Sequence, residues 1–159
     1  MKIILCPNPF RDKGLKAAYQ AQRILSAAGA KTEYCFPFPV EKSNIGDIDP
    51  SIKIKEMKTE LPDADFLVCF GGDGTILHAA KDASSFGVPI VGVNMGSVGF
   101  MAELEQGELS DLTRLVSGEY TLENRMLLDV RVIREGRVIF RSTALNDAVI
   151  TKGAVARVI

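Results

Sequence analysis

Apolar residues in the first third of the chain occur as two short runs on either side of a stretch with helical spacing. Residues 3–6 form an apolar run that ends at Pro7, which is typical of a buried parallel strand. At residues 15–28 the apolar positions recur at helical spacing, and Gly29 follows as a C-cap. Residues 31–36 indicate a second strand. We therefore predict a β-α-β unit, whose right-handed crossover builds a parallel sheet.

The middle of the chain repeats this alternation after a loop. Residues 37–50 contain three prolines, which favour a loop. The strongest buried-strand pattern follows at residues 66–70 and leads directly into a run of glycines. The other elements expected here are a weak helix at 51–61 ended by Pro62, a helix at 76–87, a buried strand at 89–93 and a short helix at 109–118.

After Gly118 the apolar positions change to an alternation with a period of two, seen at residues 128–133. Glu135 and Gly136 indicate a turn, and further strands are expected at 138–140, 146–150 and 155–159. Closely spaced antiparallel strands are typical of a β-sandwich or a β-meander. We predict an α/β protein with a Rossmann-like, parallel-sheet nucleotide-binding domain at residues 1–118. The start of an all-β sandwich domain, incomplete at its C-terminus, is expected at residues 119–159.

The amino-acid composition and the net charge exclude several classes of protein. The 159 residues are 47% hydrophobic and 25% charged, which excludes an intrinsically disordered protein. The net charge of −1 argues against a basic nucleic-acid-binding protein and against a polybasic membrane anchor. Cys6, Cys35 and Cys69 lie in or beside apolar runs without a CxxC pair, so we predict buried, reduced thiols. The N-terminal apolar run is too short for a signal peptide, and we expect a cytoplasmic protein.

The segment Gly71-Gly72-Asp73-Gly74-Thr75 lies between the strongest strand pattern and a helix. Open parallel sheets bind ligands at this end of their strands, and glycines let backbone N–H groups approach phosphate oxygens. No Gly-Lys-Ser/Thr sequence follows, so the segment is not a Walker A loop. A carboxylate beside phosphates is unfavourable unless it binds Mg²⁺ or takes a proton from a hydroxyl, and both roles belong to phosphoryl transfer. The alternative is a glycine-rich turn in which Asp73 caps the helix.

A second glycine-rich loop, at residues 92–100, follows the next predicted strand. The carboxyl ends of parallel strands share one edge of a sheet, so the two loops are expected to form the walls of a nucleotide cleft. Phe100, at the end of this loop, either stacks on an aromatic base or packs in the core.

Four further residues are candidates for ligand contact. Asn146 can donate and accept while Asp147 accepts, which suits a base edge and a ribose hydroxyl as well as an ordinary turn. His78 faces the same way as Gly74 on the predicted helix, so it either reaches a phosphate or ribose or is structural. Arg157 either clamps a phosphate or is merely exposed.

Taken in order, four segments resemble the NAD kinase family, namely residues 71–77, 92–103, 124–126 and 145–147. The Gly-Gly-Asp-Gly-Thr sequence at residues 71–75 is by itself shared with diacylglycerol-type lipid kinases and phosphofructokinases. The sequence at residues 92–100, followed by Asn-Asp in a β-rich region, is far more specific. The resemblance implies transfer of the γ-phosphate of ATP, or of phosphate from polyphosphate, to the 2′-hydroxyl of the adenosine ribose of NAD. It further implies a divalent metal such as Mg²⁺, NAD bound between an α/β and an all-β domain, and a homo-oligomer, either a dimer or a tetramer.

The resemblance also implies roles for single residues. Asp73 is expected to be the catalytic residue, as the general base for the 2′-hydroxyl. The residues expected to contact the nucleotide are Asp73, Gly74 through its backbone, His78, Phe100 beside the adenine, Asn146, Asp147 and Arg157. No residue is assigned as a metal ligand.

Members of the family are considerably longer, so we expect this chain to be the N-terminal part of such a kinase. Two alternatives remain open. One is a truncated, non-catalytic nucleotide-binding fragment, and the other is a related kinase that phosphorylates a lipid or sugar hydroxyl and shares the segment at residues 71–75.

Overall fold

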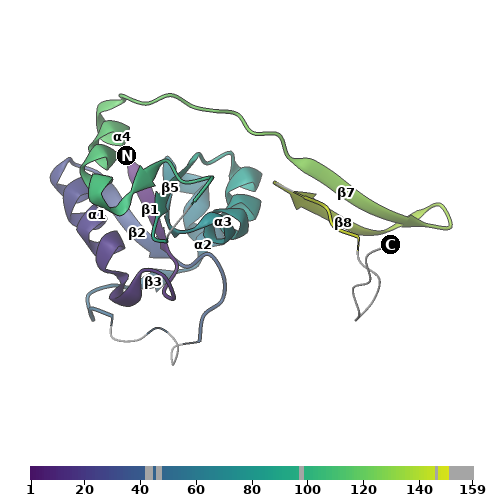
Figure 1. Ribbon diagram of the computed structural model, residues 1–159, viewed down its shortest axis with the longest axis horizontal. Coiled ribbons are helices and arrows are strands. Elements are labelled where there is room, and N and C mark those ends of the chain that lie inside the picture. The colour runs from purple at the N-terminus through teal and green to yellow at the C-terminus, as the bar shows by residue number, and fades with distance from the viewer. Residues whose placement is uncertain (42–44, 46–47, 97–98, 146, 151–159) are drawn as a thin grey trace. The chain divides into compact units, whose positions relative to one another are not determined.

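The computed structural model describes residues 1–41, 45, 48–96, 99–145 and 147–150 of the chain (Figure 1). The chain divides into two compact units, Met1–Leu122 and Glu123–Ile159, and each is described by itself. The domain boundary expected at residue 118 stays a prediction. In the part of the chain that the structure describes, no helix combines the length and the apolar character needed to cross a membrane.

The first unit is built on a six-stranded sheet in which every neighbouring pair of strands is parallel. Its strands are β1 (Lys2–Pro7), β2 (Lys31–Cys35), β3 (Ile54–Lys55), β4 (Phe66–Gly71), β5 (Ile90–Asn94) and β6 (Leu104–Glu105). Their order in the sheet, β3-β2-β1-β4-β5-β6, is that of the Rossmann fold. The predicted α/β fold with a parallel sheet is therefore confirmed.

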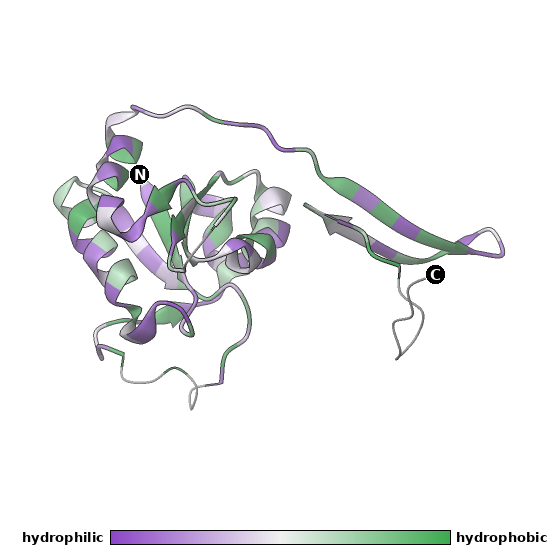
Figure 2. Cartoon of the chain, in the orientation of Figure 1, coloured by the Kyte–Doolittle hydropathy of each residue, from purple (hydrophilic) through white to green (hydrophobic). Residues whose placement is uncertain are grey.

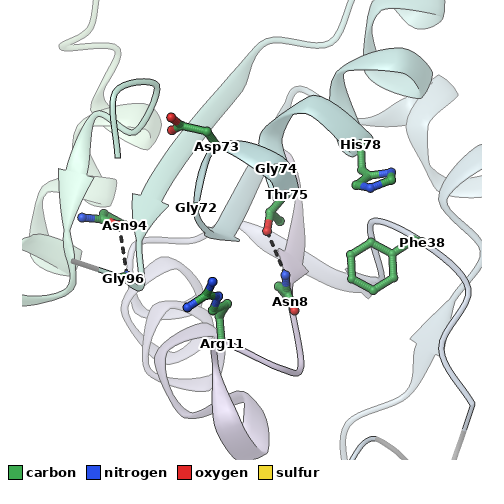
Figure 3. Close-up of a pocket in the computed structure, with 10 residues that line it drawn as sticks. All are labelled: Asn8, Arg11, Phe38, Gly72, Asp73, Gly74, Thr75, His78, Asn94 and Gly96. Carbon is green, nitrogen blue, oxygen red and sulfur yellow. Dashed lines mark hydrogen bonds between the residues drawn. The ribbon is translucent and has the colours of Figure 1, made fainter. Parts of the chain in front are cut away.

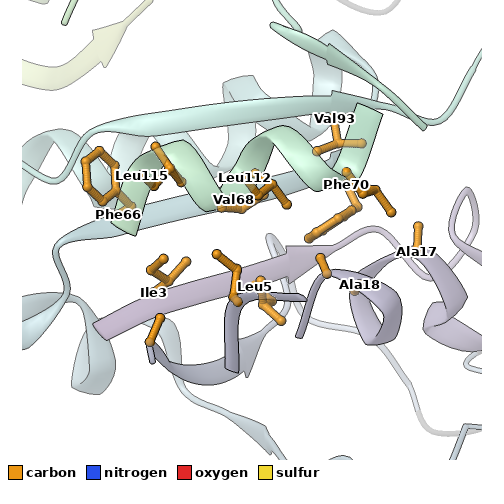
Figure 4. Close-up of a cluster of buried hydrophobic side chains, with 14 of the residues drawn as sticks. Ile3, Leu5, Ala17, Ala18, Phe66, Val68, Phe70, Val93, Leu112 and Leu115 are labelled. Atoms are coloured by element: carbon orange, nitrogen blue, oxygen red, sulfur yellow. The ribbon is translucent and has the colours of Figure 1, made fainter. Parts of the chain in front are cut away.

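Helices cover both faces of this sheet. The helical elements are η1 (Lys13–Leu15), α1 (Lys16–Ala27), α2 (Met57–Glu60), η3 (Leu61–Asp63), α3 (Asp73–Phe86), η4 (Gln106–Leu112) and α4 (Thr113–Ser117). On one face, α1, η4 and α4 pack against alternate residues of β1 and β4, such as Leu5 and Phe70 (Figure 4). On the other face, α2 and α3 pack against the intervening residues, such as Ile4 and Leu67. The central strands are thus buried on both sides, as expected for a parallel sheet.

The segment at residues 51–61 differs from the predicted weak helix. It contains β3, a two-residue strand, followed by α2. Pro62 does not end a helix here, since it lies in the first turn of η3, where a missing backbone N–H costs nothing. A two-residue strand is too short to show a periodic pattern, and the same holds for β6.

The prediction of buried, unpaired cysteines is confirmed. Cys6, Cys35 and Cys69 are free and buried, and Cys6 and Cys69 are direct neighbours on β1 and β4. Burial raises the pKa of the Cys6 thiol well above its ordinary value, and a hydrogen bond with Cys69 adds to the shift. Burial also raises the pKa of Cys35 to about 12. The thiols of Cys6 and Cys35 are therefore protonated at neutral pH.

The second unit contains an antiparallel hairpin of β7 (Leu128–Arg134) and β8 (Arg137–Ala144). Glu135 and Gly136 connect the strands with φ values of 49° and 74°, as a two-residue type I′ turn requires. The predicted alternation is visible as stripes of hydropathy along β7 (Figure 2). Side chains of both strands are mostly exposed.

The two further strands predicted in this unit are not found in its described part. Residues 147–150 form no regular element. Residues 146 and 151–159, which include the strand predicted at 155–159, lie outside the described residues. The all-β character of the second unit thus rests on the hairpin.

Candidate functional site

A cavity of about 410 Å³ opens at the carboxyl ends of the central strands of the first unit (Figure 3). Its lining residues are Asn8, Arg11, Phe38, Gly72, Asp73, Gly74, Thr75, His78, Asn94 and Gly96. They belong to the segments at the ends of β1, β2, β4 and β5. The strand order reverses between β1 and β4, and open α/β sheets bind ligands at this point.

The turn between β4 and α3 forms one wall of the cavity. β4 ends at Gly71, and α3 begins at Asp73 after Gly72. A Cβ atom at Gly71 would overlap the buried side chain of Thr75, so only glycine fits there. A Cβ atom at Gly74 would meet nothing within 4 Å, so this turn is open on the cavity side. The N-terminus of α3 adds a positive dipole that favours an anion.

The Asp73 carboxylate links the two glycine-rich loops. Its oxygens accept hydrogen bonds from the backbone N–H groups of Met101 at 3.0 Å and Phe100 at 3.3 Å. The alternative of Asp73 as the helix N-cap is wrong, because Gly72 occupies that position and no side chain caps α3. Instead, the carboxylate faces the loop that follows β5. A carboxylate accepts about four hydrogen bonds, so these two leave acceptor positions for a ligand.

A buried asparagine fixes the second loop. Asn94 is 4% exposed, and its Nδ2 donates to both carboxylate oxygens of Glu105 at 3.1 and 3.2 Å, while its Oδ1 accepts from the Gly96 N–H at 3.0 Å. The Met95 N–H donates to the Gly71 carbonyl at 2.8 Å, which joins the two loops. Sequence analysis did not single out Asn94. The signal for it is a polar residue at the carboxyl end of an otherwise apolar strand.

Asn8 joins the loop after β1 to α3. Its Nδ2 donates to Thr75 Oγ1 at 3.0 Å, and its Oδ1 accepts from the Phe10 N–H at 3.0 Å. Its own N–H donates to the Phe70 carbonyl at 2.9 Å. Sequence analysis missed Asn8 and Thr75 as a pair, because the bond depends on the neighbouring positions of β1 and β4 in the sheet.

Aromatic rings lie at one side of the cavity. The rings of Phe38 and His78 meet edge to face, with 5.3 Å between their centroids and an interplanar angle of 66°. Phe38 also stacks with Phe10, with 6.3 Å between the centroids. His78 is exposed and lines the cavity, so it is not a core histidine.

The structure brings Asp73, Gly74 and His78 to one cavity. Phe100 lies beside Asp73 through its backbone, and its side chain is 88% exposed, so the alternative that it packs in the core is wrong. Asp147 belongs to the second unit. Asn146 and Arg157 lie outside the described residues. The ligand contacts assigned to all of these residues stay predictions.

The chain is similar to known NAD kinases in sequence and in fold. Residues 3–120 match the family described as "ATP-NAD kinase N-terminal domain". The NAD kinase of Acetivibrio thermocellus is 32% identical over 160 residues, which cover 100% of this chain and 53% of that protein. The NAD kinase of Symbiobacterium thermophilum is 43% identical over 98 residues, which cover 61% of this chain and 35% of that protein.

Among solved structures, the crystal structure of yeast NADH kinase complexed with NADH superposes with a TM-score of 0.66 at 17% identity. The match covers 91% of this chain and 46% of the yeast chain, and at this identity it supports the fold alone. The chain spans about half the length of the curated relatives that match its whole length.

Proposed function

The chain belongs to the NAD kinase family, and we propose that the protein transfers the γ-phosphate of ATP to the 2′-hydroxyl of the adenosine ribose of NAD, which gives NADP. The observation that carries the proposal is the Asp73 carboxylate, held between two glycine-rich loops beside a cavity at the carboxyl edge of a parallel sheet. The family match supports the same reaction, since residues 3–120 include Asp73, both glycine-rich loops and the cavity lining.

We assign Asp73 the role of general base. As the 2′-oxygen attacks the γ-phosphorus and ADP leaves, the hydroxyl proton passes to the Asp73 carboxylate. The N–H groups of Phe100 and Met101 hold this carboxylate without using all its lone pairs. Its position is therefore fixed while an acceptor direction remains for the ribose hydroxyl, and such positioning supplies much of the rate enhancement in phosphoryl transfer.

The other predicted residues contact the nucleotide in this proposal. The open backbone at Gly74 approaches phosphate oxygens, and the exposed ring of Phe100 offers a face to the adenine. The residues that complete NAD binding are His78, Asn146, Asp147 and Arg157. Of these, His78 is supported by its place in the cavity lining.

Mg²⁺ would enter with ATP and neutralise charge on its phosphates. Mg²⁺ is usually held by one or two carboxylates together with substrate phosphates, and Asp73 offers a carboxylate of this kind in the cavity. Within the described residues there is no group of three or more His, Cys, Asp or Glu side chains able to hold a metal ion. We assign no residue of the chain as a resident metal ligand.

We further propose that the protein is a homo-oligomer and acts in the cytoplasm. The free, buried thiols of Cys6, Cys35 and Cys69 support the location, because reduced cysteines are typical of that compartment. Light scattering of the natural form of the protein would measure the size of the oligomer. We expect a dimer or a tetramer.

Formation of NADP tests the proposal. The natural form of the protein is incubated with ATP, Mg²⁺ and NAD in the presence of a diacylglycerol and a sugar as competing acceptors. We expect NADP and ADP in equal amounts. Phosphorylation of the lipid or the sugar with inert NAD would contradict the proposal. Binding of NAD without any product would instead identify a non-catalytic nucleotide-binding protein.

A further inference from the structure

Arg11 lines the cavity from the side of β1, and we propose that its guanidinium binds the triphosphate chain of the phosphoryl donor. This inference rests on the proposed function, because it assigns one substrate of that reaction to one side of the site. Sequence analysis did not identify Arg11, whose position gives no periodic or motif signal.

The backbone on both sides of Arg11 is fixed. The Asn8 carbonyl accepts hydrogen bonds from the N–H groups of Arg11 at 2.9 Å and Asp12 at 2.8 Å. The buried Asp12 carboxylate in turn accepts from the N–H groups of Ala17 and Ala18, at 2.9 and 3.0 Å, at the start of α1. The Arg11 side chain therefore extends from a fixed backbone. Less conformational entropy is then lost when the side chain binds a ligand.

The Arg11 guanidinium is available for an anion. No carboxylate of the described residues forms an ion pair with it. It shares the cavity with the N-terminus of α3, which carries positive partial charge. Two positive groups that converge on one cavity repel each other unless an anion lies between them. A guanidinium offers phosphate two parallel N–H donors, so a phosphate chain suits this position.

The side of the site on which Arg11 lies identifies the donor. The Asp73 carboxylate is bonded to the loop after β5, whereas Arg11 follows β1, on the opposite side of β4. In Figure 3 the Asp73 carboxylate and Arg11 lie on opposite sides of the Gly72 turn. The attacking and leaving oxygens of a phosphoryl transfer lie roughly in line through phosphorus. If the base faces the acceptor hydroxyl, the rest of the donor's phosphate chain extends toward Arg11.

Calorimetric titration of the natural form of the protein tests this assignment with three probes, inorganic tripolyphosphate, ATP with Mg²⁺, and NAD. We expect Arg11→Gln to weaken tripolyphosphate and ATP binding about 10- to 100-fold, which is the loss typical of charged hydrogen bonds. The affinity of Arg11→Gln for NAD should differ from that of the wild type by less than about twofold. Arg11→Lys keeps the positive charge but loses the two parallel N–H donors of the guanidinium. Its affinity for tripolyphosphate and ATP should therefore lie between those of the wild type and Arg11→Gln.

The matched control is Arg23→Gln, which removes an exposed arginine of α1 outside the cavity lining and should bind like the wild type. Equal melting temperatures of the variants would show that folding is intact. Wild-type affinity for tripolyphosphate in Arg11→Gln would overturn the proposal, as would a wild type that binds neither phosphate probe. A loss confined to NAD would overturn the assignment to the donor.

If the proposed NAD kinase activity is wrong, the results differ from those expected if only the assignment of Arg11 is wrong. In that case the wild type forms no NADP, yet tripolyphosphate binding still depends on Arg11. If NADP does form, Arg11→Gln should raise the KM for ATP and leave the KM for NAD unchanged. A KM for ATP equal to that of the wild type would overturn the inference while the function stands.

Discussion

The two units of the chain use their β-strands in opposite ways. In the first unit, β1 and β4 are apolar runs buried on both faces between helices. In the second unit, β7 and β8 alternate in polarity and remain mostly exposed. A two-stranded hairpin is at best marginally stable alone, whereas a helix-covered parallel sheet provides a rigid support. The described catalytic candidates therefore lie where the strands are buried.

The charged residues of the cavity in the first unit differ from those of the hairpin in the second. In the hairpin, Asp129 forms ion pairs with Arg131 and Arg141, so these charges satisfy one another. In the cavity, Asp73 and Arg11 do not pair with each other and lie on different sides of one turn. Charged side chains that do not pair with each other can interact with a ligand. In this respect Asp73 and Arg11 differ from the paired charges of the hairpin.

Thiol labelling should show the largest contrast between the units. Cys6, Cys35 and Cys69 are buried, so each reacts only when the first unit opens. For a domain stable by about 5 kcal/mol, we expect alkylation at least about 10³-fold slower than in urea, followed for each peptide by mass spectrometry. The control is Val132→Cys in the exposed hairpin, which should react at nearly the rate of an unfolded thiol. Equal rates for Val132→Cys and the three native thiols would contradict the contrast.

Removal of one phenyl ring from each unit gives a smaller difference. Phe70 is 0% exposed in the core of the sheet, and Phe140 is 55% exposed on β8. We expect Phe70→Ala to lower the free energy of unfolding by about 3–5 kcal/mol, because it leaves a cavity. Phe140→Ala should change it by about 0.5 kcal/mol or less. Urea unfolding measures both values, and a similar loss in the two variants would show that the hairpin is packed as tightly as the core.

The smallest expected difference concerns two carboxyl groups. Burial raises the pKa of Asp12 above its ordinary 3.8, although backbone N–H groups, that of Ala17 foremost, oppose the shift. Hydrogen bonds from Arg141 and then Arg131 lower the pKa of Asp129 below 3.8. Carbon-13 NMR of the carboxyl groups should therefore record Asp12 titrating at a higher pH than Asp129.

These two shifts predict opposite effects of pH on stability. The contribution of Asp12 is present at low pH and is lost as the pH rises through its raised pKa. The contribution of Asp129 is present above pH 3.8 and is lost as the pH falls through its lowered pKa. Asp129→Asn is the control, since it should remove the acid sensitivity of the hairpin. The reverse order of titration would contradict at least one of the two pKa shifts.

Sequence patterns predict the parts of this fold that repeat over many residues. The apolar runs of β1 and β4 and the helical spacing of α1 predict the α/β fold, and Glu135-Gly136 predicts the hairpin turn. Strands of two residues, such as β3 and β6, have no period to detect.

The same limit applies to the site. The glycine-rich segment predicts where Asp73 and Gly74 lie, because glycines between a buried strand and a helix are typical of a ligand-binding turn. The contact between Asn8 and Thr75 and the place of Arg11 depend on which strands become neighbours, and no local pattern encodes this. Asn94 likewise shows its role only once its bonds to Glu105 and Gly96 are seen.

The proposed role of Asp73 as the base of a phosphoryl transfer to NAD is tested by a comparison of two variants of α3. NADP formation is measured for the natural form of the protein and for its Asp73→Asn and Asp82→Asn variants. Asp82 lies on the same helix outside the cavity lining, so its variant should keep wild-type activity. We predict that Asp73→Asn lowers kcat by about 10²- to 10⁴-fold, as expected for a lost general base. Activity of Asp73→Asn within a few-fold of the wild type would contradict the role of Asp73 as the general base.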